Sequence, residues 1–169
     1  MISPSYTALN AKLHETRPDY GSGGHLQAGM VASLIQQSGA KSFLDYGAGK
    51  GTLCAVLRQS CPGCDLREYD PAMPAIAAVP EPADVVACND VLEHIEPEYL
   101  DAVIADLRRV TLKIGYYNIA TRPAKKTLED GRNAHLIVEP MKWWLPKFLD
   151  AFEIRTLQVA RGGFAMVVS

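Results

Sequence analysis

A glycine-rich turn, Asp45-Tyr46-Gly47-Ala48-Gly49-Lys50-Gly51, directly follows the apolar pair Phe43-Leu44. The residues over 42–45 predict a short buried strand, and the apolar positions over Thr52–Ser60 predict a helix immediately after the turn. Glycines at alternate positions let the backbone turn tightly and approach a ligand with no Cβ in the way. Free amides and the dipole at the start of the next helix favour an anionic group such as a carboxylate. The turn is therefore a candidate ligand-binding loop.

Two better-known glycine loops do not fit this turn. A dinucleotide-binding fingerprint needs its third glycine at position 52, which is Thr52. A P-loop needs glycine at 44 and a hydroxyl residue at 51, where the chain has Leu44 and Gly51. Asp70, 19 residues after Gly51, closes a second predicted strand, where a carboxylate can accept both hydroxyls of a ribose. Structural turns also use glycine, so the glycine loop alone is weak evidence for a ligand site. The loop, the following helix and Asp70 together are much stronger evidence.

Strands and helices alternate along the rest of the chain. The predicted strands are Leu66–Tyr69, Asp84–Cys88 and Lys113–Ile119, with a closing hairpin of Ile154–Val159 and Phe164–Val168. One helix is predicted over 100–110 and another over 141–152, where Pro146 should kink or split it. This order predicts an α/β fold, a single-domain mostly parallel sheet with helices on both faces.

Apolar spacing also predicts which helix faces are buried. The expected inward residues are Leu26, Met30, Leu34 and Ile35 before Gly39, then Leu53, Val56 and Leu57 after the glycine turn. In the last helix they are Met141, Trp144, Leu145, Phe148, Leu149 and Phe152. Gly39 is expected to end its helix as a C-cap.

Composition fits one globular domain. The chain has 169 residues, 48% of them hydrophobic, and a net charge of −2 from 17 basic and 19 acidic side chains. This balance disfavours a protein that grips nucleic acid through phosphates. The stretch Pro71–Pro80 is too short and too rich in proline to span a membrane, and the first fifteen residues hold no apolar leader, so we expect a cytoplasmic protein. The stretch Cys61-Pro62-Gly63-Cys64 predicts a tight turn whose two cysteines are free thiols. No metal site is expected.

These residues resemble the class I S-adenosylmethionine-dependent methyltransferases over about Leu34–Ser169. Asp45–Gly51 matches the acid-x-Gly-x-Gly-x-Gly signature of the family, and Asp70 matches its ribose-binding acid. Ala83–Ile95, which contains Asn89-Asp90-Val91-Leu92-Glu93-His94, is similar to the fourth-strand segment of small-molecule members. The resemblance implies S-adenosyl-L-methionine as cofactor and S-adenosyl-L-homocysteine as product. It also implies a Rossmann-like core at 41–169 preceded by a helical arm or lid at 1–40.

The chain departs from the family pattern after Asp70. Members usually carry a helix and a third strand between the ribose acid and the fourth strand. Here 13 residues separate Asp70 from Asp84, and four of them are proline. We therefore expect the third strand to be missing and the order to be 2-1-4-5-7-6 in the family's numbering. The adenine ring must then be held by other side chains, with candidates Ala72, Met73, Val91 and Leu92.

The resemblance also implies the cofactor-binding residues. They are Asp45, Gly47, Ala48, Gly49, Gly51, Asp70, Pro71, Asn89, Asp90, Val91 and Leu92. Of these, Gly47, Ala48 and Gly49 would line the methionine part. Asn89 and Asp90 would border the methyl-transfer site.

The loop Glu129-Asp130-Gly131-Arg132-Asn133-Ala134-His135 supplies the catalytic candidates. His135 can act as a general base near neutral pH, with Asp130 orienting it and Arg132 holding an anion on the acceptor. The alternative is that His135 and Asn133 merely cap this loop and the next helix. The predicted substrate-binding residues are Tyr20, His94, Arg132, Asn133 and Trp143.

The favoured acceptor is a small or medium-sized molecule, possibly anionic in view of the basic residues over Arg122–Arg132, methylated at O, N or C. The segment Asn89-Asp90-Val91-Leu92 lacks the Pro-Pro-aromatic pattern of enzymes that methylate amino groups on nucleic-acid bases. Two alternatives remain open. One is a non-catalytic S-adenosylmethionine-binding accessory protein, and the other is a nucleotide or nucleic-acid methyltransferase.

Overall fold

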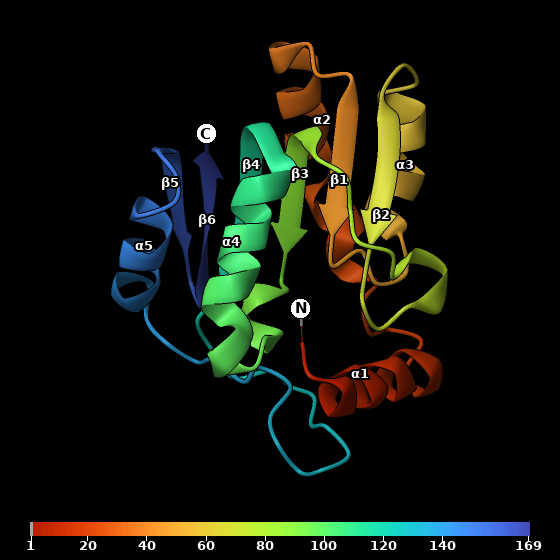
Figure 1. Ribbon diagram of the computed structural model, residues 1–169, viewed down its shortest axis with the longest axis vertical. Coiled ribbons are helices and arrows are strands. Elements are labelled where there is room, and N and C mark those ends of the chain that lie inside the picture. The colour runs from red at the N-terminus through yellow and green to blue at the C-terminus, as the bar shows by residue number, and fades with distance from the viewer. Residues whose placement is uncertain (1) are drawn as a thin grey trace.

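A six-stranded sheet forms the centre of the computed structural model, which describes residues 2–169 (Figure 1). Its strands are β1 (Ser42–Tyr46), β2 (Asp65–Tyr69), β3 (Ala83–Asn89), β4 (Thr111–Ala120), β5 (Ile154–Ala160) and β6 (Gly163–Val168). The order is β2-β1-β3-β4-β6-β5, with β6 antiparallel to both of its neighbours and the other pairs parallel. The predicted α/β class and strand order are confirmed. Between β2 and β3 only a 3₁₀ turn, Pro74–Ile76, replaces the usual helix and strand.

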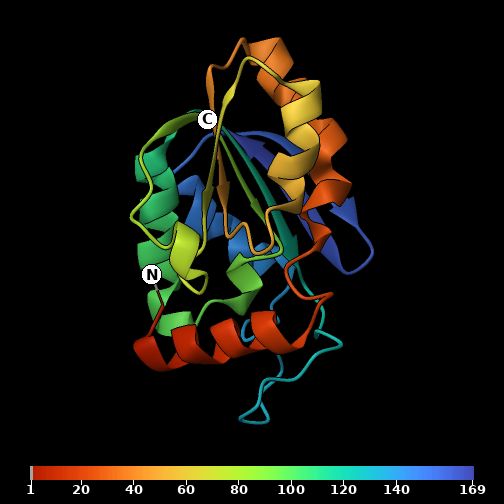
Figure 2. The same ribbon diagram turned by 90° about the vertical axis from the view of Figure 1, so that its right-hand side faces the viewer.

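Helices cover both faces of this sheet (Figure 2). They are α1 (Pro4–Thr16), α2 (Ala28–Ser38), α3 (Thr52–Ser60), α4 (Leu100–Val110) and α5 (Met141–Leu149). Short 3₁₀ turns add Gly23–Gln27, Leu92–His94 and Pro97–Tyr99. The helix α1 lies across the end of the sheet where β1 and β3 finish, with the loop after β4 beside it (Figure 1). None of the helices within residues 2–169 is long and apolar enough to cross a membrane.

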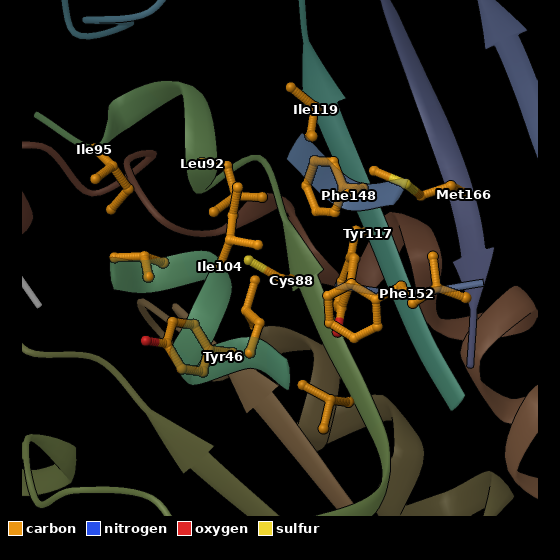
Figure 3. Close-up of a cluster of buried hydrophobic side chains, with 14 of the residues drawn as sticks. Tyr46, Cys88, Leu92, Ile95, Ile104, Tyr117, Ile119, Phe148, Phe152 and Met166 are labelled. Carbon is orange, nitrogen blue, oxygen red and sulfur yellow. The ribbon is translucent and has the colours of Figure 1, made fainter. Parts of the chain in front are cut away.

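Each face of the sheet has its own apolar core. On one face, α4 and α5 bury a cluster with the aromatic residues Tyr117, Phe148 and Phe152 beside Ile104 (Figure 3). On the other face, α2 and α3 pack Val31, Ile35, Leu53, Leu57 and Cys54 against the strands. Both faces of the sheet are therefore covered by helices. A ligand is expected at the carboxyl ends of the parallel strands, next to α1 (Figure 1).

The N-terminal helix faces do not all match the predicted ones. Leu26 is 74% exposed because it lies in the 3₁₀ turn before α2, out of phase with the buried residues of the helix. Those are Ala28, Val31, Ala32 and Ile35, whereas Met30 and Leu34 pack only at the margin of the core. Gly39 caps α2 in the left-handed region with φ of +64°, as predicted.

Two further helix predictions were wrong in detail. In α3 the small Cys54 is buried in place of Val56, which is 42% exposed. In α5 the side chain of Leu149 points to solvent. Pro146 does not split that helix, because it is the sixth of nine residues and removes only one hydrogen bond near the end, while Trp144 and Phe148 anchor the helix in the core.

The two adjacent tryptophans of α5 give a test of this packing. Trp144 is fully buried and donates its indole N–H to the carbonyl of Glu139 at 3.2 Å, whereas Trp143 lies at the surface under Lys147. We expect Trp144→Ala to lower the free energy of unfolding by about 3–5 kcal/mol. Trp143→Ala should cost about 1 kcal/mol or less. Urea unfolding followed by far-UV circular dichroism measures both, and equal losses would contradict the assignment of the core face.

Candidate functional site

A cavity of about 340 Å³ opens at the carboxyl ends of β1 and β3. The glycine turn and the end of β2 form one wall, and the end of β3 with the loop after β4 forms the opposite wall. The helix α1 and the segment up to Gly24 close the third side. This position is where parallel sheets of this type hold their ligands.

The three glycines of the turn have a left-handed backbone conformation, which residues with a side chain rarely adopt. Gly47, Gly49 and Gly51 have φ of +83°, +52° and +67°. A Cβ on Gly49 would lie 2.7 Å from the carbonyl oxygen of Gly21, and one on Gly47 would run into Val91. The amides of Gly47 and of Ala48 next to it both donate to the carbonyl of Tyr69, at 2.7 and 3.0 Å. The turn therefore sits tightly between β2 and the N-terminal arm.

Asp70 joins the end of β2 to this turn. Its carboxylate is 8% exposed and accepts the amide of Gly49 at 3.0 Å with one oxygen and the amide of Ala72 at 2.9 Å with the other. A carboxylate has about four lone-pair sites, so each oxygen can accept a further bond. Because Asp70 lines the cavity, a ligand with two neighbouring hydroxyls fits here.

Asp45 adds a second buried acid at the root of the turn. Burial, helped by the neighbouring charges of Glu68 and Asp70, raises the pKa of Asp45 to about 7. Its carboxyl group lines the same cavity. A positively charged ligand at this wall would favour the ionised form.

Two polar residues at the end of β3 face the cavity from the opposite wall. The amide of Asn89 has both its nitrogen and its oxygen buried, and within residues 2–169 neither has a hydrogen-bond partner. Asp90 follows with φ of +52°, an unusual backbone conformation that clusters at ligand sites. The amide of Asn89 therefore has a donor and an acceptor free to bond a group in the cavity.

The N-terminal arm forms the cover of the cavity. The hydroxyl of Tyr20 donates to Asn10 of α1 at 2.9 Å, and the carbonyl of Gly21 accepts the amide of Lys50 at 2.9 Å. The arm is thus attached to the glycine turn itself. Further lining residues from α1 are Tyr6, Asn10 and His14.

Acidic and imidazole side chains meet between the end of β3 and the loop after β4. Glu93 is fully buried; one carboxylate oxygen accepts the amide of Ala120 at 2.9 Å and the other has no partner within residues 2–169. Burial together with Asp90 raises the pKa of Glu93 to about 8. Burial and the neighbouring His135 lower the pKa of His94 to about 3, and the two rings stand nearly perpendicular with centroids 4.7 Å apart.

The tautomer of His135 follows from its hydrogen bond. Its Nδ1 lies 2.6 Å from the carbonyl oxygen of Arg122, which can only accept, so Nδ1 carries the proton. The neutral ring then has its lone pair on Nε2. The backbone amide of His135 donates to the side chain of Asn133 at 2.9 Å.

The structure does not bring Asp130 to His135. Asp130 accepts from the guanidinium of Arg132 at 2.7 and 2.8 Å, and neither side chain lines the cavity. Asn133 braces the loop instead, since its amide exchanges two 2.9 Å hydrogen bonds with the backbone of Ala124. Arg132 also lies over the ring of Tyr6, which stabilises the loop against α1.

The remaining predicted residues divide between cavity and scaffold. Those that line the cavity are Tyr20, Asp45, Gly47, Ala48, Gly49, Asp70, Pro71, Asn89, Asp90, Val91, His94 and His135. Leu92 is buried in the core, Gly51 caps α3, and Trp143 lies on α5 at 37% exposure.

Sequence reasoning missed one wall of the cavity. The spacing of Tyr6, Asn10 and His14 at i, i+4 and i+8 places them on one side of a helix, and this polar face was the available signal. The role of Glu93 in the site was missed as well, because an acidic residue within an apolar segment is usually expected at the surface.

The family described as "Methyltransferase domain" matches residues 20–160. An O-methyltransferase family protein from Burkholderia thailandensis has a similar structure, with a TM-score of 0.71 and 15% identity over 99% of this chain and 62% of that chain. The chain thus spans about three fifths of that relative's length. No protein of curated function matches the sequence.

Two other solved structures share the fold. One is the 1,6-didemethyltoxoflavin-N1-methyltransferase of Burkholderia thailandensis, with a TM-score of 0.69 and 15% identity over 99% of this chain and 90% of that chain. The other is the magnesium protoporphyrin IX methyltransferase of Synechocystis PCC 6803, with a TM-score of 0.59 and 18% identity over 86% of this chain and 81% of that chain. With its strand order, its glycine turn and a family match over residues 20–160, the chain belongs to the class I S-adenosylmethionine-dependent methyltransferases.

Proposed function

We propose that this chain transfers a methyl group from S-adenosylmethionine to a small or medium-sized acceptor inside the cavity. The observation that carries the proposal is that one cavity is lined both by the glycine turn with Asp70 and by a second polar wall from Asn89 to His135. The glycine turn with Asp70 suits the cofactor. Asn89 and Asp90 would border the methyl-transfer site, and the side of His135 suits an acceptor. S-adenosylhomocysteine is bound in the structures of the toxoflavin and protoporphyrin enzymes, which are named for small acceptors.

The chain's own residues fit the cofactor. Asp70 would accept the ribose hydroxyls with its free lone pairs, and the open backbone of Gly47–Gly49 would lie along the methionine part. The unpartnered amide of Asn89 would bond a polar group of the same ligand. Ala72 and Val91 line the cavity and are the remaining candidates beside the adenine ring. The bound cofactor supplies an electrophilic methyl group on a sulfonium sulfur.

Alignment of the acceptor atom with this methyl group is the main catalytic task of the protein. The N-terminal arm, which covers the cavity, would hold the acceptor together with the loop after β4 and would exclude water (Figure 1). A cavity of about 340 Å³ accommodates a small molecule rather than a folded nucleic acid. Arg122, Lys125 and Lys126 line the cavity, so they replace Arg132 as candidates to hold an anionic group.

His135 is the side chain placed to take a proton from an acceptor that must lose one. Its Nε2 lone pair is fixed by the bond from Nδ1 to the carbonyl of Arg122. The orienting role foreseen for Asp130 passes to that carbonyl. The arm at 1–40 acts as a lid in this proposal, and a cytoplasmic location stays a prediction from the sequence.

Calorimetric titration with S-adenosylmethionine and S-adenosylhomocysteine tests the proposal. We expect both to bind with one site per chain, and failure of both would overturn it. Conversion of S-adenosylmethionine to S-adenosylhomocysteine together with one added methyl on a member of an acceptor pool, detected by mass spectrometry, separates an enzyme from a non-catalytic accessory protein. Oligonucleotides in the same pool test the nucleic-acid alternative.

Asp70→Asn should weaken the binding of S-adenosylhomocysteine at least tenfold, or about 1.4 kcal/mol, because an amide cannot accept from both sides as the carboxylate does. Asp65→Asn, an exposed acid at the start of the same strand, is the matched control and should leave affinity unchanged. Titration calorimetry measures both variants. Equal affinity of the Asp70 variant and the parent protein would remove Asp70 from the cofactor site.

The variants Gly49→Ala and Gly39→Ala separate the effect of backbone strain from the effect of the close packing between the glycine turn and the N-terminal arm. Both glycines have positive φ, so each alanine should cost about 1–2 kcal/mol of stability. A Cβ at Gly39 meets nothing within 4 Å, whereas at Gly49 it would displace the carbonyl of Gly21. We therefore expect only Gly49→Ala to lose cofactor affinity, as measured by titration at a temperature where both variants are folded. Parallel losses in the two variants would show that strain alone acts.

A further inference from the structure

We propose that Glu93, His94 and His135 form a binding site for a divalent transition-metal cation on the acceptor side of the cavity, with Asp90 as a neighbouring carboxylate. This inference deepens the proposed function and rests on it for the role of the metal, although the site itself is tested independently. It replaces our expectation from the sequence that the chain has no metal ligands.

The three side chains converge. Glu93 and His94 come from the 3₁₀ turn after β3, and His135 comes from the loop after β4. One potential ligand atom of each lies within 4.8 Å of the other two. Ligand atoms bonded to one ion at about 2.0–2.2 Å lie roughly 3–3.5 Å apart, so small side-chain rotations would complete the set.

At two of the residues a hydrogen bond to the backbone occupies one of the two possible ligand atoms. The amide of Ala120 donates to one oxygen of Glu93 and leaves the other without a partner. Nδ1 of His135 donates to the carbonyl of Arg122 and leaves the lone pair on Nε2. Metal ligands in proteins are commonly held in this way, with the second polar atom bonded to the backbone. Nδ1 of His94 is also buried without a partner among residues 2–169.

An ionised Glu93 would have no lysine or arginine beside it in the described part of the chain. Its side chain is fully buried, and among residues 2–169 no ion pair involves it. Asp90 lies beside it in a strained backbone conformation and faces it with a second carboxyl group. Two neighbouring buried carboxylates need a proton or a cation between them.

The donor set indicates the class of ion. Two imidazoles with one or two carboxylates suit Mn²⁺, Fe²⁺, Co²⁺ or Zn²⁺ better than Mg²⁺ or Ca²⁺, which prefer oxygen ligands. Three protein ligands leave at least one coordination position open. Since Asp90, His94 and His135 all line the cavity, that position would face the acceptor.

An open position of this kind points to acceptors that carry a hydroxyl group. A cation held there would lower the pKa of a hydroxyl that it contacts. The proton would be lost to bulk water as the acceptor binds, before the cover excludes water. The oxygen then forms its bond to the methyl carbon while the carbon–sulfur bond breaks, which leaves an ether and a neutral thioether. The Nε2 lone pair of His135 would then hold the cation instead of accepting the proton.

Binding of Mn²⁺ to the full chain, after treatment with a chelator, tests the site directly. Electron paramagnetic resonance measures free Mn²⁺, and thiols compete poorly for this ion. We expect one Mn²⁺ per chain, and we expect Glu93→Gln and His135→Ala each to weaken binding about 100-fold or more. His25→Ala is the matched control, because this exposed histidine bonds only the carbonyl of Ser22 with its ring and should not affect the affinity.

Titration with S-adenosylhomocysteine in the same samples keeps the two proposals apart. Cofactor binding without stoichiometric Mn²⁺ would overturn the metal site and leave the proposed function intact. Mn²⁺ affinity that is equal in Glu93→Gln and the parent protein would place the ion elsewhere and also overturn it. Far-UV circular dichroism confirms that each variant is folded, and Mn²⁺ should raise the melting temperature of the parent protein but not of Glu93→Gln.

Discussion

The carboxylate of Asp70 accepts the amide of Gly49 with one oxygen and the amide of Ala72 with the other, and the rest of the site depends on these two bonds. They join the end of β2 to the glycine turn and to the start of the next segment. The glycine turn also holds the N-terminal arm, because the amide of Lys50 donates to the carbonyl of Gly21. One buried acid therefore sets the position of the glycine turn and, through it, of the N-terminal arm.

Two arginine side chains, one from β2 and one from α4, hold the short connection from β2 to β3. The guanidinium of Arg67 donates to the carbonyl of Pro82 at 3.0 Å, and that of Arg109 donates to the carbonyl of Pro80 at 3.0 Å. Prolines lack an amide hydrogen and cannot donate to a strand ladder, which disfavours a strand in this segment, while the carbonyls of Pro80 and Pro82 accept from the two arginines. These bonds hold the segment in place without a strand of its own, and Ala72 near its start lines the cavity.

The sequence was sufficient to predict the glycine turn and the missing third strand, because glycine and proline constrain the backbone directly, whereas the strand order was implied by the resemblance to the methyltransferase family. It was insufficient for the loop after β4. Asp130 and Arg132 pair with each other at the surface, and such local pairing leaves no periodic signal. The contact of Glu93 with His135 joins residues 42 positions apart, which only the packing of the loop after β4 on the end of β3 determines. The missed residues are therefore those that long-range packing brings together.

Acids stand on both walls of the cavity, and this distribution constrains what can occupy it. Asp45, Asp70 and Asp90 line the cavity, and Glu93 lies buried beside Asp90. Burial raises the pKa of Asp45 to about 7 and that of Glu93 to about 8, so a positive charge that enters the cavity is matched by the loss of protons from these groups. A cationic sulfonium gains more from such walls than the neutral thioether that methyl transfer leaves. The same acids that favour the charged methyl donor would therefore favour release of the product.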